Sequence, residues 1–119
     1  MASVNPALHN ALVRVSAANA VLRLRLEEND GLVGQAISMN DSGSTAREIL
    51  DALPIQQSMQ AADDALMSLV EARDHLRTVT VHAALTSGMD ADELAERFEV
   101  PREVIDSFAK RRPAGLQDF

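Results

Sequence analysis

The sequence predicts an all-α protein, and three observations support this. The 119 residues include no Cys, Trp or Tyr, so the core must be mostly aliphatic and no disulfide framework is available. Ala, Leu, Glu, Arg and Gln dominate, and these residues favour helices. Residues that favour strands are sparse and never alternate with polar residues over a useful length. We expect an antiparallel hairpin or bundle of two long helices with a short helix between them, followed by two short C-terminal helices.

The first long helix is expected to begin at Asn5, an N-cap, with Pro6 in the first helical turn. No helix breaker follows until Asn29, Asp30 and Gly31, which allows about 24 helical residues, or roughly 36 Å. The helix carries a principal apolar stripe that is interrupted near Ala18 and widened by further apolar residues: Leu8, Leu12, Val15, Leu22 and Leu26, with Val21 and Leu24 beside them. Such a stripe is broad enough for more than one partner helix.

Glycines at 31, 34 and 43 predict that region 31–44 is a short helical turn between loops, with a loop at 40–44. A short helix should follow, because Thr45 and Glu48 have the spacing of a capping box. Pro54 is then expected to end or bend this helix.

The second long helix is expected over 54–87, with Gly88 as its C-terminal cap. Its apolar residues recur at spacings of three and four, which is typical of a coiled-coil seam: Met59, Ala62, Leu66, Leu69, Leu76, Thr80 and Ala83. Arg73 falls within this seam and would reach water or pair with an acid of another chain. The β-branched run 78–81 predicts a bend.

Residues 1–88 are therefore expected to form a helical hairpin that assembles as a homodimer. The residues expected at the oligomer interface are Leu66, Leu69, Arg73 and Leu76.

Region 89–112 predicts two short helices. Asp90 is the expected N-cap of the first, with Glu93 placed to complete a capping box, and Pro101 suits the first turn of the second. The first helix carries an apolar stripe of Leu94, Ala95 and Phe98, and the second, which runs to about Arg112, carries Val104, Ile105 and Phe108. The two stripes can close on each other across a turn at 99–100.

This pattern resembles the helix-turn-helix DNA-binding family. Ala95 and Phe98 match its small and apolar positions in the first helix, and Ile105 and Phe108 match its inward positions in the second. Glu99 departs from the pattern, because the family most often has Gly at this left-handed position, where a Cβ costs roughly 1 kcal/mol. The resemblance implies that the second helix enters the major groove of DNA. The residues expected to touch or flank the DNA are Arg102, Glu103, Asp106, Lys110, Arg111 and Arg112.

The charge of the chain weighs against this function. The net charge is −7, and from Ser87 onward five Lys or Arg stand against eight Asp or Glu. DNA-binding proteins draw most of their affinity from neutralising phosphates, so an acidic module must rely on a local basic patch. The alternative role of these cations is to complement the dipole at a solvated helix C-terminus.

Catalytic and metal-binding patterns are weak. His75 and His82 are seven residues apart, whereas helical metal ligands are usually three or four apart, so neither a metal nor another cofactor is expected. A small-molecule substrate is not expected either. The sequence shows no run near the roughly 20 apolar residues of a membrane span and no secretory signal, which predicts a cytoplasmic protein.

Two functions follow from these observations. The first is a small non-enzymatic regulator whose hairpin dimerises and whose helix-turn-helix binds DNA. The alternative is an acidic helical adaptor or inhibitor, of the kind that phages also supply, which covers a basic or apolar surface of another protein. The tail 113–119 is interrupted by Pro113 and Gly115 and is not expected to form an element.

Overall fold

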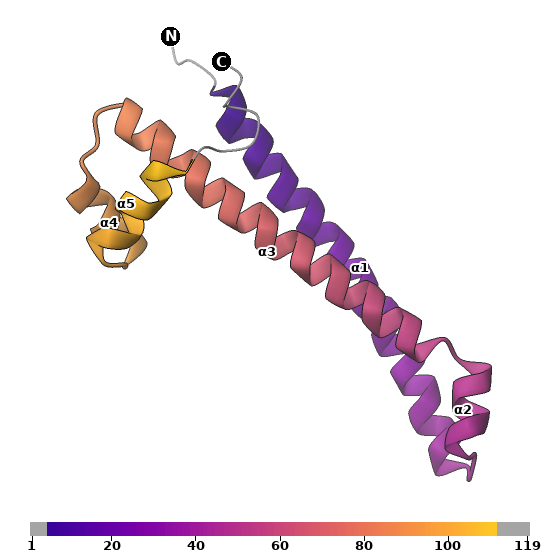
Figure 1. Ribbon diagram of the computed structural model, residues 1–119. Coiled ribbons are helices and arrows are strands. Elements are labelled where there is room, and N and C mark those ends of the chain that lie inside the picture. The colour runs from indigo at the N-terminus through magenta and orange to yellow at the C-terminus, as the bar shows by residue number, and fades with distance from the viewer. Residues whose placement is uncertain (1–4, 112–119) are drawn as a thin grey trace. The chain divides into compact units, whose positions relative to one another are not determined.

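The computed structural model describes residues 5–111, and within that range the chain is all-helical, with five helices and no strand (Figure 1). The helices are α1 (Pro6–Asp41), α2 (Ala46–Ala52), α3 (Ile55–Thr86), α4 (Ala91–Phe98) and α5 (Arg102–Lys110). The predicted fold class is therefore confirmed, as is the order of long, short and long helices followed by two short ones. None of the described helices is both long and apolar enough to cross a membrane.

The chain forms two compact units. Unit 1 takes its described residues from Met1–Ser16 and Glu71–Phe119, and unit 2 is Ala17–Val70. Unit 1 therefore contains the first turns of α1, the last turns of α3, and α4 and α5. In unit 1, α4 and α5 pack on the end of α3.

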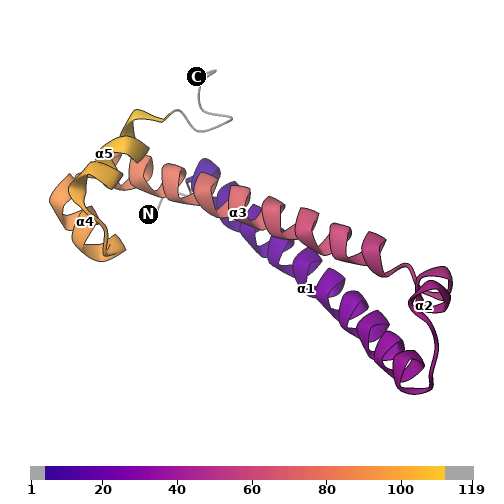
Figure 2. The same cartoon turned by 60° about the horizontal axis from the view of Figure 1, so that its bottom comes forward.

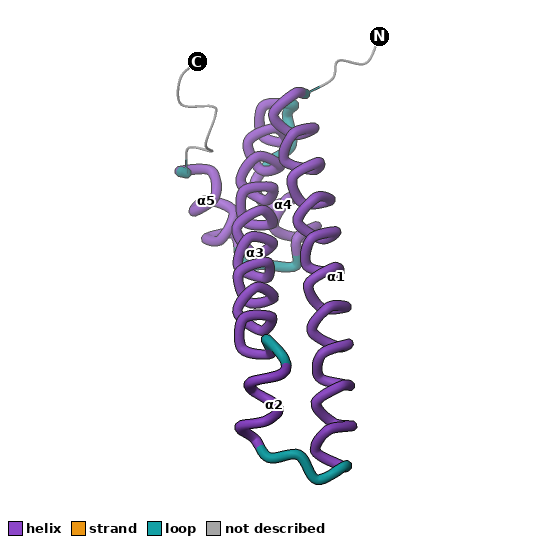
Figure 3. The backbone as a smooth tube through the Cα atoms, turned by 90° about the vertical axis from the view of Figure 1, so that its right-hand side faces the viewer, coloured by secondary structure: helices purple, strands orange, loops and turns teal. Residues whose placement is uncertain are grey.

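In unit 2, the α1 and α3 segments run antiparallel, and α2 lies in the connection between them (Figures 1 and 3). The Asn29 side-chain amide donates a hydrogen bond to Ser58 Oγ at 3.3 Å. This contact shows which turns of the two helices are neighbours. An Asn at a seam position is a common device for fixing helix register.

The inner seam of unit 2 is defined by the buried and half-buried positions of α1 and α3 that recur at spacings of three and four residues. In α1 these are Ala18, Leu22, Arg25, Asn29, Leu32, Ala36 and Met39, and in α3 they are Ile55, Ser58, Ala62, Ala65 and Leu69. The spacing alternates between three and four residues, which is the coiled-coil spacing predicted for α3.

The predicted membership of these stripes was partly wrong. The large residues Leu26, Met59 and Leu66 remain about half exposed, whereas Ala65 is 6% exposed. On α3 the seam contains Ser58 and Ala65, and in unit 1 Ala72. The prediction had placed the following residue, Met59, Leu66 and Arg73, at these three positions. Small side chains allow helix axes to approach closely, and this choice also leaves Arg73 exposed rather than within the seam.

The prediction that α1 ends near residue 30 was also wrong, because α1 continues through both glycines to Asp41. Gly31 and Gly34 lie on the exposed side, where a Cβ would meet no atom within 4 Å, while Leu32 and Ala36 continue the inner seam. Packing along the seam outweighs the helix propensity cost, which is roughly 1 kcal/mol for each glycine. The loop is correspondingly shorter, and Gly43 supplies a positive φ of 93° in it.

Several predicted helix ends are confirmed. Asn5 Oδ1 accepts a hydrogen bond from the Leu8 backbone N–H, and both bonds of the Thr45 and Glu48 capping box are present. The helix α2 ends at Ala52, before Pro54, and Gly88 follows α3 with a φ of 104°.

The β-branched run 78–81 does not break α3, which is helical without interruption to Thr86. The hydroxyl groups of Thr78 and Thr80 donate to the backbone carbonyls of Asp74 and Leu76, at 3.1 and 2.7 Å. Val79 and Val81 are buried, so packing compensates for the low helix propensity of this run.

Candidate nucleic-acid interface

The helices α4 and α5 pack on the last turns of α3 in unit 1 (Figure 2). The core of this three-helix cluster is Val81 from α3, Leu94 from α4, and Ile105 and Phe108 from α5, all buried. Partly buried apolar residues surround it: Ala84, Leu85, Met89, Ala91, Ala95, Phe98, Val100, Val104 and Ala109. The predicted apolar stripes of α4 and α5 thus face a common core.

Local signals determine how α4 begins and ends. Asp90 is its N-cap, and its carboxylate accepts a hydrogen bond from the Glu93 backbone N–H at 2.8 Å. A capping box would also have the Glu93 carboxylate accept from the Asp90 backbone N–H. Instead, Glu93 Oε2 lies 3.6 Å from Arg97 Nε. At the other end, Glu99 adopts the left-handed conformation, with φ 56° and ψ 45°. Its backbone N–H bonds to the carbonyls of Ala95 and Glu96, which closes the helix.

The start of α5 differs by one residue from the prediction. Pro101 is the N-cap rather than the first helical residue, and α5 runs from Arg102 to Lys110. Arg111 forms the C-cap. Arg112, also predicted to contact DNA, lies outside the described residues.

The solvent side of α5 carries most of the residues predicted to touch or flank DNA. Arg102, Glu103, Asp106 and Lys110 are all exposed on this helix. Arg102 is held by acids on both sides: its Nη1 lies 3.1 Å from Asp92 Oδ1 of α4, and its Nε lies 3.8 Å from Asp106 Oδ1. The structure therefore brings the predicted residues together on one helix, but a cation among them is already paired.

Arg111 ties the end of α5 to α3. Its Nη1 lies 2.9 and 2.8 Å from the two carboxylate oxygens of Asp74, and its guanidinium stacks on the Phe108 ring at 4.6 Å from the ring centroid. The His82 Nε2–H donates to the Arg111 backbone carbonyl at 2.6 Å. Sequence reasoning missed the roles of Asp74 and His82, because these partners are 37 and 29 residues from Arg111 in the chain.

Arg102, Lys110 and Arg111 are the described cations that were predicted to bind phosphate, and two of them, Arg102 and Arg111, form ion pairs with carboxylates. Exposed ion pairs are weak, typically below about 1 kcal/mol, so DNA phosphates can compete for Arg102 and Arg111. The displaced carboxylates of Asp92 and Asp74 would then remain near the phosphates and repel them. Lys110 has no ion-pair partner within residues 5–111.

The residues predicted at the oligomer interface lie in different environments. Leu66 and Arg73 are exposed, and Leu76 is half-buried. Leu69 is only 3% exposed and belongs to the inner seam, so its side chain is not offered to another chain. The described part of the chain contains no group of three or more His, Asp or Glu side chains placed to hold a metal ion.

Comparison of the chain with models of protein families, with curated proteins and with solved structures gave no significant match. Any function must therefore be argued from the residues and their geometry.

Proposed function

We propose that this chain is a small non-enzymatic regulatory protein of the cytoplasm, and that α4 and α5 act as a helix-turn-helix with α5 entering the major groove of DNA. The observation that carries the proposal is the turn at Glu99. A residue with a Cβ holds the left-handed conformation there, at a cost of roughly 1 kcal/mol, at the position where the helix-turn-helix family usually has Gly.

Two further features support DNA contact through α5. The apolar sides of α4 and α5 are consumed by the core, so the outer side of α5 is free to meet a ligand. Lys110 and Arg111 lie at one end of that helix and Arg102 at the other, which allows phosphate contacts at both ends while the residues between approach base edges.

The acidic surroundings make a specific prediction about affinity. Asp74→Asn should release Arg111 and remove a repelling charge, and it should raise the DNA affinity about threefold at 50 mM salt, as expected for one charge about 6 Å from a phosphate in water. Lys110→Ala should instead lower affinity for all sequences and reduce the slope of log K against log salt by about 0.9. Both are measured by fluorescence anisotropy on labelled duplexes selected from a random pool.

A matched control separates release of Arg111 from a general change in net charge. Glu71→Gln removes the same charge one turn earlier on α3, from an exposed residue without an ion pair among the described residues. We expect a smaller gain than for Asp74→Asn. If neither the natural chain nor an Asp74→Asn, Asp92→Asn double variant retains DNA at 50 mM salt, DNA contact by α5 is overturned.

The alternative function, an acidic adaptor that binds another protein, is favoured by one specific observation. Both Arg102 and Arg111 are engaged by carboxylates, so the candidate DNA surface is largely neutralised within the chain. Under this alternative, the charge variants leave DNA retention absent, and a stable complex with a protein partner survives Lys110→Ala.

A further inference from the structure

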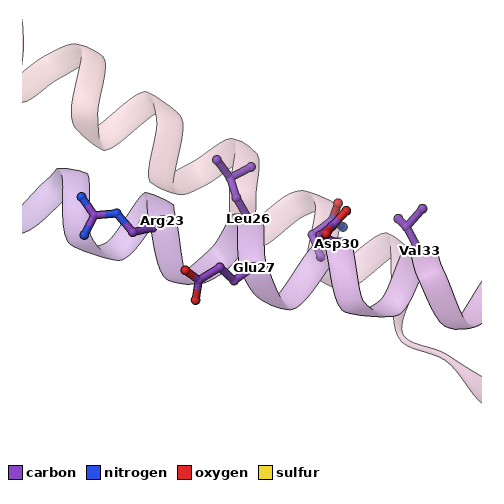
Figure 4. A pocket seen from close by; sticks show the side chains of 6 residues that line it. Arg23, Leu26, Glu27, Asp30 and Val33 are labelled. Atoms are coloured by element: carbon purple, nitrogen blue, oxygen red, sulfur yellow. The ribbon is translucent and has the colours of Figure 1, made fainter.

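The helices of unit 2 carry a second set of large apolar side chains outside the inner seam. Each of the six is between 37% and 57% exposed, and together we call them the apolar face: Leu26, Val33 and Ile37 of α1, and Met59, Leu66 and Val70 of α3. Leu26 and Val33 line an open hollow along α1 together with Arg23, Glu27, Asn29 and Asp30 (Figure 4).

The apolar face lies on one side of the hairpin. Leu26 and Val33 each follow a seam residue of α1 by one position, as Met59 and Leu66 do on α3. Two antiparallel helices are related by a 180° rotation about an axis perpendicular to the plane that contains them. Residues that follow a seam residue by one position therefore lie on the same side of that plane in both helices. Ile37 and Val70 extend the two rows, since residues four apart on a helix are neighbours.

This surface is larger than unit 2 needs for its own packing. Within unit 2 the buried residues are Ala65 and Leu69, so a single layer of two helices encloses very little. Helices that are packed on two sides carry apolar residues at the seam and on one adjacent flank, which is the pattern of four-helix bundles. A contiguous exposed apolar patch of several hundred Å² generally marks an interaction site.

We propose that a second copy of this chain covers the apolar face, with α1 of each copy packed antiparallel on α3 of the other, so that Leu26 of one copy meets Met59 of the other. The inference does not depend on DNA contact, because the residues proposed to meet DNA belong to unit 1.

Charges beside the apolar face favour a second copy over a basic partner. Because Asn29 lies beside Ser58 and helices rise equally per residue, Arg23 is level with Asp64, and Asp63 is one residue away. Arg23 and Asp63 occupy equivalent positions on the outer flank of the face in α1 and α3. When α1 of one copy covers α3 of the other, each Arg23 meets Asp63 of the second copy. Glu27 and Asp30, the acids of the same stretch of α1, are level with Gln60 and Gln57, so a second copy opposes them with uncharged side chains. A second copy therefore pairs Arg23 with an acid without opposing like charges, whereas a basic partner would be matched by a uniformly acidic rim.

Matched pairs of exposed residues test the proposal by sedimentation equilibrium. The natural chain should have twice its mass of 12.9 kDa at tens of micromolar. Leu26→Glu and Leu66→Glu should each raise the dissociation constant of the dimer at least tenfold. Each substitution removes a large apolar side chain from the contact in both copies. The controls Leu24→Glu and Met67→Glu replace residues that are 50% and 59% exposed but lie outside the apolar face, and they should leave the dimer unchanged. Circular dichroism confirms that each variant keeps its helices.

Cross-linking tests the arrangement without disturbing the core. The chain has no Cys, so single-cysteine variants report one position each. A mixture of Leu26→Cys and Met59→Cys chains should form disulfide-linked heterodimers, and a mixture of Leu24→Cys and Met67→Cys chains should not. A monomer at all concentrations, or equal effects of the face variants and their controls, overturns the proposal. These measurements contain no DNA, so a failure here is distinguishable from a failure of the proposed DNA contact.

Discussion

Unit 1 encloses Leu94, Ile105 and Phe108 in a core built from three helices, whereas unit 2 buries Ala65 and Leu69 between two. The exposed large apolar residues are distributed in the opposite way. Ten of those in the described chain lie in unit 2: Val21, Leu24, Leu26, Val33, Ile37, Leu50, Met59, Leu66, Met67 and Val70. Unit 1 has Leu12 and Val13.

The difference shows what a third helix contributes. A third helix converts two facing stripes into an enclosed volume, in which a side chain such as Ile105 loses all contact with water. Two helices alone leave each outer flank in water, however regular their seam is. Unit 1 is therefore equipped to hold its own fold, while the stability of unit 2 should depend on what covers its apolar face.

The largest expected effect comes from removing a side chain from the enclosed core. Ile105→Ala should reduce the free energy of unfolding by about 2–5 kcal/mol, because it loses buried apolar contact and leaves a cavity. Leu66→Ala, at a dilution where the chain is monomeric, should cost less than about 1 kcal/mol, since that side chain is already half exposed. Urea unfolding followed by circular dichroism, with hydrogen exchange to locate the loss, measures both.

The control for this comparison is concentration. The Leu66→Ala cost should grow as the protein concentration rises into the range where the proposed dimer forms, while the Ile105→Ala cost should stay constant. Equal costs for the two variants in the monomer would contradict the contrast between the units.

A smaller effect is expected from the glycines inside α1. Gly34→Ala should stabilise unit 2 by about 0.5–1 kcal/mol, because the backbone there is helical and an added Cβ meets no atom within 4 Å. Gly43→Ala is the matched control and should destabilise, since its φ of 93° is unfavourable for any residue with a Cβ. Thermal unfolding of both variants measures the difference, and a Gly34→Ala variant no more stable than the natural chain would contradict a helix at that position.

The sequence predicted those parts of the fold that depend on neighbouring residues. The N-caps at Asn5, Thr45 and Asp90 and the stop at Gly88 are signals within four residues, and they act as expected except that Glu93 does not complete the capping box at Asp90. The inward stripes of α4 and α5 were also predictable, because short amphipathic helices have one apolar side. The left-handed turn at Glu99 followed from its position in the pattern rather than from its residue type.

The parts that failed depend on contacts between distant segments. Choosing the largest apolar residues as the seam favoured Leu26 and Leu66 over Ala65, because hydrophobicity does not show how closely two helices approach. The glycines of α1 were expected to break the helix. Whether the helix continues depends on whether packing of the inner seam outweighs the low helix propensity of glycine, and the local sequence does not show this. The pairing of Arg111 with Asp74 depends on the fold of unit 1, so the candidate DNA surface looked more basic in the sequence than it is in three dimensions.

The smallest expected effect is a pH dependence confined to the capping box of α2 in unit 2. Hydrogen bonds from the Thr45 backbone N–H and from its hydroxyl lower the pKa of Glu48 below its ordinary value of 4.5. A lowered pKa means that the folded state favours the charged carboxylate. The resulting stabilisation is complete above pH 4.5 and is lost as the pH falls through the lower, folded-state pKa. Backbone amides of α2 should therefore exchange faster with solvent below that range, relative to α4.

Glu48→Gln should remove this pH dependence, because the amide accepts a hydrogen bond but does not titrate in that range. Asp51→Asn, in the same helix but outside the capping box, serves as the charge control and should keep the dependence. If the α2 amides of the natural chain and of Glu48→Gln respond to acid alike, the loss of protection arises elsewhere in unit 2. The sparse packing around α2, which has no buried residue, would then be the more direct explanation.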